Sequence, residues 1–335
     1  MNASRPEITV AMPAYNAAVH LREAMGSILS QTFEDFELLV VDDGSTDDTY
    51  ALACSTNDSR VRVERLPANK GRATARNMAL GRARGRYLAW MDADDISLPR
   101  RLELQHACLE ARAHLHVCGA GVEYFGHSDV LEMFAEQPEA ARAAALFGAP
   151  VANGCAMLRL DAVRGLGLHY DAALARAEDL AFWADALLAA DIQATSLQIP
   201  LLRYRYAPSP QARQWHIRAL LGHVFPPLGI SASGAQAALH AGLVYGGVAD
   251  PVAALRWLDT LWQTWTARYG QDAHMRRHLA VFTARILREA AVEPQKADSA
   301  ARALRQLSIA MELQQRLETE SRARARLEGI ASKRG

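Results

Sequence analysis

The sequence predicts an α/β protein with a mixed, mainly parallel sheet flanked by helices and a C-terminal all-α extension. Two observations support this prediction. Short apolar runs alternate with amphipathic helical patterns up to about residue 210, an order typical of parallel sheets. From residue 211 onward only helical spacing is found, so we expect two regions, 1–210 and 211–335. The sequence does not disclose whether the second region serves docking, oligomerisation or another role.

The first hundred residues contain four segments that we expect to be strands. These segments are residues 8–12, 37–41, 61–65 and 87–91. Helical spacing separates them at residues 21–29 and 73–83, and Thr46 or Asp47 can cap a further helix after the second segment. Strands and helices in this order form one Rossmann-like sheet, with the connecting loops at one edge.

Acidic groups directly follow two of these strands. Asp42 and Asp43 end the second strand, and the segment Asp92-Ala93-Asp94-Asp95 ends the fourth. Carboxylates this close repel one another and lose hydration when buried, so a compensating cation is expected, and a hard divalent ion suits them. A helix-capping acidic turn is the simpler alternative, because a helical pattern opens at Pro99.

Basic side chains are expected at the same edge of the sheet. Lys70 lies in the basic turn 69–72 that follows the third strand, and Arg76 lies in the helix after it. Carboxylates that accept from base and ribose donors, beside cations that neutralise phosphates, suit a nucleoside diphosphate. The chain has no GxGxxG and no GxxxxGK[ST] segment, the fingerprints of dinucleotide-binding and P-loop proteins.

The composition argues against several other classes. Lys and Arg total 37, as do Asp and Glu, so the formal net charge of +0 disfavours general electrostatic binding to nucleic acid. The four cysteines have no CxxC spacing and are expected to be reduced and packed. Because no signal-peptide or membrane-spanning segment is recognised, the expected location is cytoplasmic, with optional peripheral contact at the inner face of the membrane.

Four segments carry a resemblance to a known family. They read VAMPAYN, SILSQTFEDFELLVVDDGSTDDT, NKGRATARNMAL and GRYLAWMDADD. In order and spacing they resemble the family 2 inverting glycosyltransferases with a GT-A fold, and the resemblance continues more weakly to about residue 210. The family uses nucleotide-diphosphate sugars as donors with Mn²⁺ or Mg²⁺, so the resemblance implies the same donor class and metal here.

The resemblance also implies roles for individual residues. Asp43 would accept from the nucleotide base, Asp94 would ligate the metal on the diphosphate, and Asp92 would approach the ribose or the metal. Asp95 would support that site through hydrogen bonds. The remaining residues expected to line the nucleotide site are Pro13, Ala14, Tyr15, Lys70, Arg76 and Ala93.

A second acidic pair, Glu178-Asp179, opens a helical pattern that runs to about residue 190. Attack of a hydroxyl on an anomeric carbon needs a base, and a carboxylate at a helix N-terminus stays ionised. Charge decoration of a helix start is the structural alternative. By the family resemblance Asp179 is the catalytic base and Glu178 binds or orients the acceptor. Trp183 is expected either to floor the acceptor site or to pack in the core.

The segment 201–208 departs from the family pattern at one position. Relatives often carry Tyr-Arg-x-His there, and matching Tyr204 and Arg205 places Ala207 where the histidine would fall. Because that histidine can assist metal or diphosphate binding, the metal site is the part placed in doubt. Arg203, Arg205 or Arg213 could supply the missing positive charge.

These observations lead to one hypothesis and two rivals. The hypothesis is a metal-dependent inverting glycosyltransferase that uses a UDP-sugar in glycan or polysaccharide biosynthesis, with a glycan, lipid-linked or protein acceptor. A sugar-phosphate nucleotidyltransferase would want a Gly-rich basic loop where this chain has residues 13–16. An impaired, glycosyltransferase-like scaffold is the non-enzyme alternative. In the second region a Trp and Leu stripe at residues 257–265 predicts helix packing, and a charged helix over 298–330 could dock or dimerise.

Overall fold

The computed structural model describes residues 5–207 and 211–308 and separates into two compact units, Met1–Pro227 and Leu228–Gly335. The first unit is the α/β part and the second is helical, as the sequence predicts. The division falls after helix α8 (Ala212–Ala219), whereas the sequence-based boundary falls before it. The boundary after residue 210 stays a prediction.

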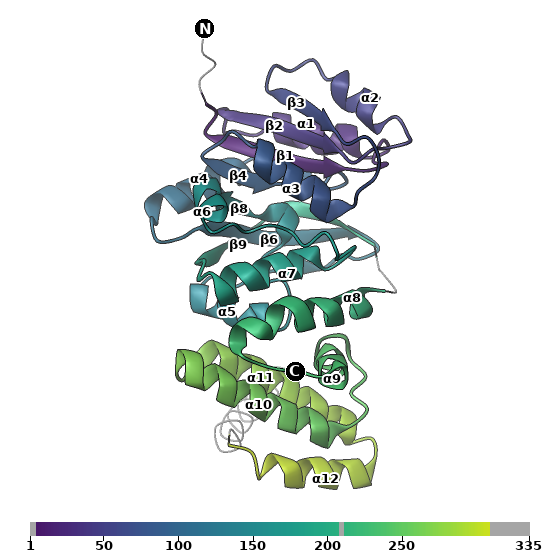
Figure 1. Ribbon diagram of the computed structural model, residues 1–335, viewed down its shortest axis with the longest axis vertical. Coiled ribbons are helices and arrows are strands. Elements are labelled where there is room, and N and C mark those ends of the chain that lie inside the picture. The colour runs from purple at the N-terminus through teal and green to yellow at the C-terminus, as the bar shows by residue number, and fades with distance from the viewer. Residues whose placement is uncertain (1–4, 208–210, 309–335) are drawn as a thin grey trace, which may run out of the picture. The chain divides into compact units, whose positions relative to one another are not determined.

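One sheet of nine strands forms the centre of the first unit (Figure 1). Its strands are β1 (Ile8–Ala14), β2 (Phe36–Asp42), β3 (Val61–Arg65), β4 (Tyr87–Trp90), β5 (Ile96–Ser97), β6 (Val117–Gly126), β7 (Leu131–Glu132), β8 (Met157–Arg159) and β9 (Ala194–Tyr206). They lie in the order β3-β2-β1-β4-β8-β6-β9-β5, with β7 paired to β6. Neighbours β3, β2, β1 and β4 are parallel, as are β6 and β9, whereas β8, β5 and β7 pair antiparallel. The sheet is therefore mixed and mainly parallel, and the predicted fold class is confirmed.

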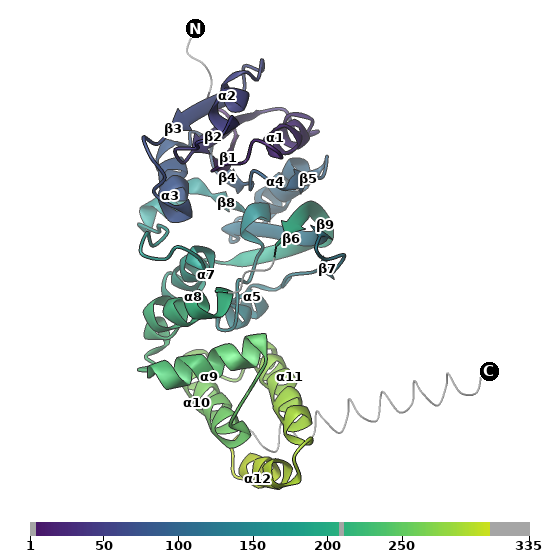
Figure 2. The ribbon, with the colours of Figure 1, turned by 90° about the vertical axis from the view of Figure 1, so that its right-hand side faces the viewer.

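Helices flank both faces of this sheet, and Figure 2 shows α3 (Arg72–Arg82) on one side and α1 (Leu21–Leu29) and α4 (Arg101–Ala111) on the other. The inward sides of α1 and α4 form one hydrophobic core with alternate residues of β1, β4 and β6. The remaining helices and turns of this unit are α2 (Thr49–Cys54), α5 (Pro138–Ala145), α6 (Leu160–Gly165), α7 (Glu178–Ala184), η1 (Asn153–Cys155), η2 (Asp185–Ala189) and η3 (Leu220–Val224). The short turn η4 (Pro226–Leu228) contains the point of division.

The strand β1 extends further than its sequence indicates. We expected Pro13 to stop it, yet β1 continues to Ala14. β4 pairs with β1 only as far as Ala11, so at Pro13 the strand has a neighbour on one side alone and needs no N–H there. This extension carries the backbone of β1 to the same sheet edge at which β2 ends in Asp42.

Strand β9 is not indicated by the sequence in its full length of 13 residues. Pro200 interrupts its apolar pattern, and the structure places a register shift beside it, between Ala120 and Val122 of β6. The strand resumes after this irregularity and runs to Tyr206. Its end is thereby brought back to the acidic end of β4, because Arg205 N–H donates to Asp95 Oδ1 at 2.8 Å.

The second unit consists of the helices α9 (Gly234–Tyr245), α10 (Pro251–Tyr269), α11 (Ala273–Ala290) and α12 (Pro294–Leu304). The predicted apolar stripe of α10, including Trp257, Trp262 and Trp265, is buried, so its packing role is confirmed. Of the charged helix predicted over 298–330, the structure describes the part to residue 308, and the rest lies outside the described residues. None of the described helices is long and apolar enough to cross a bilayer.

Candidate active site

The carboxyl ends of β1, β2 and β4 meet at one edge of the sheet, where β1 separates β2 from β4. In open α/β sheets ligands bind outside these strand ends, at the point where the strand order reverses. Asp43 follows β2 and Asp92 follows β4, so both predicted acidic ends lie at this edge. The structure thus brings the two halves of the predicted nucleotide site together.

Asp43 is buried and fixed by backbone groups. Its Oδ1 accepts from Lys70 N–H at 2.7 Å and its Oδ2 accepts from Gly71 N–H at 2.9 Å. Burial raises the pKa of Asp43, and these two hydrogen bonds oppose the rise. The next residue, Gly44, has φ +65°, and a Cβ there would come 2.4 Å from the Ala68 carbonyl carbon, so only glycine fits the turn. Each carboxylate oxygen of Asp43 keeps a second lone pair.

Arg76 joins the two acidic parts of the site. Its Nη2 donates to Asp92 Oδ1 at 3.1 Å and its Nη1 donates to Glu178 Oε1. The side chain is almost fully buried, and its guanidinium lies 5.5 Å from the ring centre of Tyr170. Burial disfavours the charge, yet Asp92 and Glu178 outweigh it and raise the pKa of Arg76. Arg76 therefore links the end of β4 to the start of α7.

The predicted acceptor-side pair lies at that start of α7. Glu178 is buried, and burial raises its pKa while Arg76 opposes the rise. Asp179 is half-buried, and its Oδ1 accepts from Leu180 N–H at 2.8 Å. Ala177, just before the pair, has φ +60°, a left-handed conformation that is uncommon for a residue with a Cβ. Such strain persists where the surrounding structure enforces it, often at functional sites.

The acidic end of β4 presents its three carboxylates differently. Asp94 is exposed, Asp92 is half-buried and Asp95 is 1% exposed. The surrounding protein and the charge of Asp92 raise the pKa of Asp94, and burial raises that of Asp95 further. The predicted supporting role of Asp95 is consistent with its hydrogen bond to the β9 backbone, made by Arg205.

A hard cation fits the donor set at this place. Asp95 Oδ2 is buried and has no hydrogen-bond partner among the described residues. Beside it lies Gly154, where a Cβ would come 3.1 Å from Asp92 Oδ2 and 3.3 Å from Asp95 Oδ2. Carboxylate oxygens are the ligands that Mg²⁺ and Mn²⁺ prefer. Among the described residues, the three ligand atoms that lie within 4.8 Å of one another belong instead to Glu7, His106 and Glu110.

That second group does not resemble a metal site, because a cation already occupies it. Arg86 donates to Glu7 at 2.8 Å and to Glu110 at 2.6 Å. His106 contacts Glu7 at 3.1 Å. A guanidinium thus holds both carboxylates.

The other predicted nucleotide contacts also lie at the edge of the sheet. Pro13 and Ala14 end β1, and Tyr15 follows with 46% of its surface exposed. Lys70 is exposed and reaches Asp43 through its backbone. Ala93 is buried within the acidic turn.

Three further residues at the site lack a clear signal in the sequence. Arg72, the first residue of α3, is exposed, and its charge opposes the rise in pKa at both Asp94 and Glu178. Burial raises the pKa of Tyr204, and the charges of Asp92 and Asp95 at the acidic end of β4 raise it further. Asn153 accepts from the Tyr170 hydroxyl at 3.0 Å and leaves its buried Nδ2 without a partner among the described residues. Of these three residues, only Arg72 was indicated by the sequence, because it lies in the basic turn 69–72.

Two open alternatives from the sequence can be located. Trp183 is fully buried against Phe182 at 5.0 Å between ring centres, so it packs in the core. Ala207 is exposed just beyond β9. Of its possible substitutes, Arg205 is engaged by the Asp94 carbonyl at 2.9 Å and by Glu23 at 3.5 Å. Arg203 lies 3.8 Å from Glu123.

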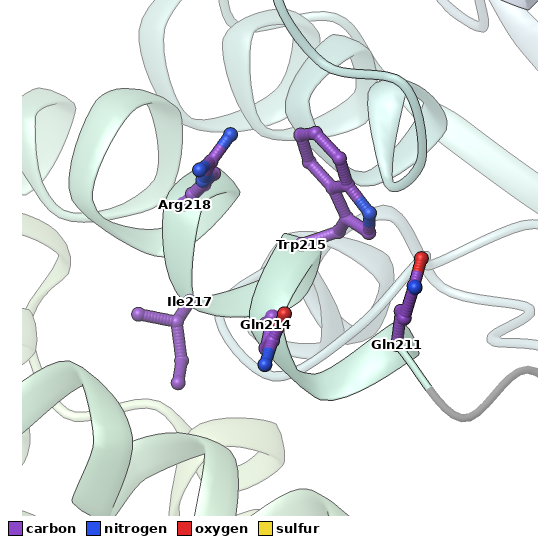
Figure 3. A pocket seen from close by; sticks show the side chains of 5 residues that line it. All are labelled: Gln211, Gln214, Trp215, Ile217 and Arg218. Carbon is purple, nitrogen blue, oxygen red and sulfur yellow. The ribbon is translucent and has the colours of Figure 1, made fainter.

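A separate pocket runs along α8 (Figure 3). Figure 3 shows Trp215 and Arg218 projecting to the same side, and the guanidinium lies 4.6 Å from the indole centre. The pocket is lined by Gln211, Gln214, Trp215, Ile217 and Arg218. None of the predicted nucleotide, metal or base residues lines it, so it is distinct from the site at the sheet edge.

Comparison with known proteins indicates a family for this chain. The family model described as glycosyl transferase family 2 matches residues 9–164. A putative glycosyltransferase, EpsE of Bacillus subtilis, is 36% identical over 186 residues, which are 54% of this chain and 66% of that protein. The UDP-Glc:alpha-D-GlcNAc-diphosphoundecaprenol beta-1,3-glucosyltransferase WfgD of Escherichia coli is 41% identical over 98 residues, 29% of this chain and 39% of that protein. The chain therefore spans less than two thirds of these relatives.

A solved structure shows the same fold over a longer stretch. S. aureus TarS 1–349, crystallised in complex with UDP, matches with a TM-score of 0.58 and 19% identity. The match covers 89% of this chain and 90% of that one. At this identity the likeness demonstrates the GT-A fold alone.

Proposed function

The chain belongs to glycosyltransferase family 2, and from that premise we propose that it transfers a sugar from a nucleotide-diphosphate sugar to an acceptor hydroxyl with inversion. The observation that carries the proposal is the buried ion-pair chain Asp92–Arg76–Glu178. It ties the strand end suited to a donor diphosphate to the helix start suited to a base. A helix-capping turn alone would not need a buried arginine shared with a second carboxylate.

The donor would lie across the carboxyl ends of β1, β2 and β4. Pro13, Ala14 and Tyr15 would line the base, with Asp43 as its hydrogen-bond acceptor. The exposed charges of Lys70 and Arg72 are available to the diphosphate. Since TarS was crystallised with UDP and WfgD is described as UDP-glucose-dependent, UDP is the nucleotide we expect.

A divalent metal would be held by Asp94 and Asp92, with Asp95 beside them. When bound, Mn²⁺ or Mg²⁺ supplies charge that stabilises the leaving diphosphate. Arg76 pairs with Asp92 Oδ1, which leaves Oδ2 toward Gly154 and Asp95. The chain's own residues thus hold the carboxylates ready for a cation.

Asp179 would be the general base. As the acceptor oxygen forms its bond to the anomeric carbon, Asp179 takes the hydroxyl proton, and the bond to the diphosphate breaks with its electron pair going to phosphate oxygen. One in-line displacement inverts the anomeric configuration. Glu178 is paired to Arg76 and would orient the base and acceptor rather than take the proton.

The acceptor is proposed by class only. EpsE and WfgD are glycosyltransferases, and WfgD is named for a diphosphoundecaprenol-linked sugar acceptor. By analogy with these relatives we propose a glycan or lipid-linked acceptor in polysaccharide biosynthesis. A protein acceptor is the alternative. A lipid-linked acceptor would require peripheral contact with a membrane.

The substitution Asp179→Asn tests the assignment. It keeps shape and removes the base, so hydrolysis of UDP-glucose or UDP-N-acetylglucosamine to the free sugar should fall by about 10²–10⁴-fold. Affinity for UDP, measured by calorimetry, should stay within about twofold, because the residue is needed for proton transfer and not for donor binding.

Asp161→Asn is the matched control, because Asp161 also accepts from the N–H of the next residue, at 2.9 Å, but in the first turn of α6. Turnover by Asp179→Asn near the wild-type rate would overturn the base assignment.

A further inference from the structure

His223 bridges two carboxylates on either side of the proposed base. Its Nδ1 lies 2.8 Å from Asp185 Oδ2, and its Nε2 lies 3.2 Å from Asp171 Oδ2. The side chain of His223 is 19% exposed and those of Asp171 and Asp185 are about one-third exposed. All three residues belong to the first unit, outside the segment that the family model matches.

The two contacts favour one protonation state of the ring. A neutral imidazole has one N–H donor and one acceptor nitrogen, and an acceptor nitrogen facing a carboxylate would be repelled. A carboxylate oxygen at each nitrogen favours the imidazolium, in which both nitrogens donate. In that form His223 is a cation shared by two anions.

The two carboxylates delimit the segment with the acidic pair. Asp171 lies in the loop before α7, and Asp185 begins the π-helical turn η2 that follows α7. Between them lies Glu178-Asp179 at the start of α7. His223 comes from η3, which packs against α7 and η2. The side chain of His223, from a distant part of the chain, thus contacts the segment 171–185 at both of its ends.

We propose that His223 is a positioning residue for the transfer reaction, holding the segment 171–185 so that the start of α7 keeps its place beside Arg76. This inference rests on the proposed function, because the segment matters only if Asp179 is the base. The two side-chain contacts of His223, Asp171 and Asp185, are not among the residues proposed to bind the donor, the metal or the acceptor. His223 acts by fixing two ends of a short element, since α7 has seven residues and is too short to be stable alone.

Acidic groups contact His223 directly, and further acidic and basic groups lie on the elements packed around it. Asp185 and Asp171 contact it, and His169 lies near Asp171. On the packed elements stand Glu178 and Asp179 of α7, and Arg213, His216 and Arg218 of α8. Hydrogen bonding to Asp185 raises the pKa of His223, with burial opposing. The bridge is therefore complete at low pH, and one of its two contacts is lost as pH rises through the raised pKa.

The test compares His223→Gln with the wild-type protein. Glutamine keeps a polar side chain but cannot hold both carboxylates as a cation. We expect amide exchange in α7, followed by mass spectrometry, to accelerate at least about tenfold, given the usual strength of hydrogen bonds to charged groups. Hydrolysis of UDP-glucose or UDP-N-acetylglucosamine should fall by about 10–100-fold, the cost of a small misplacement, with UDP affinity unchanged.

Two further variants make the result specific. His223→Arg keeps a permanent cation with several donors and should restore slow exchange at pH 8.5, where the wild-type bridge weakens. His106→Gln is the matched control, since His106 has the same side-chain exposure, 20% against 19%, and also contacts a carboxylate, but on α4. It should leave exchange in α7 and sugar-nucleotide hydrolysis unchanged.

The outcomes separate the inference from the proposed function. Unchanged exchange in α7 of His223→Gln, or equal effects of His106→Gln, would overturn the inference. Faster exchange with an unchanged hydrolysis rate would overturn it as well, because the bridge would then be merely structural. If the wild-type protein neither binds UDP nor hydrolyses a UDP-sugar, the proposed function fails, and this positioning role fails with it even if α7 exchanges faster. Loss of activity with unchanged UDP binding and faster exchange supports both.

Discussion

The proposed donor side of the candidate site, at the carboxyl ends of β1, β2 and β4, and its proposed base side, at the start of α7, are built in different ways. On the donor side, Asp43 follows a strand directly and is fixed by the backbone N–H groups of Lys70 and Gly71. On the base side, Glu178 is fixed by Arg76, which is 102 residues away in the chain. The flanking Asp171 and Asp185 are held by His223 from beyond β9.

This difference shows which parts of the chain fix the geometry of each side. Strand ends and tight glycine turns are local features, so the donor side forms wherever the parallel strands form. The base side sits on a short helix after a long loop, and its geometry comes from buried charges contributed by other elements. We therefore expect that substituting residues distant in sequence, such as Arg76 and His223, changes both stability and catalysis by disturbing the base side.

The largest effect should come from Arg76→Met. It leaves Glu178 and Asp92 without their buried partner, and breaking a buried ion pair on one side costs about 3–5 kcal/mol. Urea unfolding should show this loss of free energy of unfolding, together with loss of UDP binding.

Arg164→Met is its control, because Arg164 donates to the carbonyls of Leu80 and Ala83 and leaves no carboxylate behind. A loss for Arg76→Met no greater than that for Arg164→Met would mean that the ion-pair chain does not join the two sides.

A smaller and more selective effect is expected from Gly154→Ala. The added Cβ would come 3.1 Å from Asp92 Oδ2 and 3.3 Å from Asp95 Oδ2, so it narrows the space proposed for the cation. We expect the affinity for Mn²⁺ with UDP to fall by about tenfold, as crowding of a well-packed site costs about 1–3 kcal/mol.

Gly165→Ala is the comparison, because nothing lies within 4 Å of a Cβ there. Isothermal calorimetry with and without Mn²⁺ distinguishes the two. If Gly154→Ala binds Mn²⁺ and UDP as the wild-type protein does, the cation lies elsewhere.

The smallest effect concerns pH. The pKa of His223 is raised above its ordinary value of 6.5, so its bridge stabilises the folded state fully below about pH 6.5 and progressively less as pH rises through the raised pKa. The difference in free energy of unfolding between wild-type and His223→Gln should therefore be larger at pH 6 than at pH 9. Because the groups are partly exposed, we expect the change to be at most about 1 kcal/mol. A difference that grows with pH would contradict the imidazolium bridge.

The sequence indicated the strand ends of the candidate site more directly than the contacts around the start of α7, for a physical reason. Hydrophobic periodicity predicted the strands β1 to β4, and the acidic residues Asp43 and Asp92 marked the ends of two of them. Both signals are local in the sequence. Pro13 was misleading only because the sequence does not reveal that β4 stops pairing at Ala11. The partnership of Arg76 with Glu178 could not be read from spacing.

The same holds for residues that no motif includes. His223 and Gly154 acquire their meaning from contacts with parts of the chain 38 or more positions away, such as Asp185. β9 was obscured by Pro200, whose irregular register is a tertiary feature. Residues outside the motif region that contact the site can therefore be recognised only in the three-dimensional structure.

The central claim is that the edge formed by β1, β2 and β4 binds a nucleotide-diphosphate sugar through a divalent cation. Calorimetric titration with UDP, GDP and dTDP, each with and without Mn²⁺, tests it most directly. We predict Mn²⁺-dependent binding of UDP that Gly154→Ala weakens and Asp179→Asn leaves intact. Absence of binding by all three nucleotides, with the protein folded, would contradict the claim.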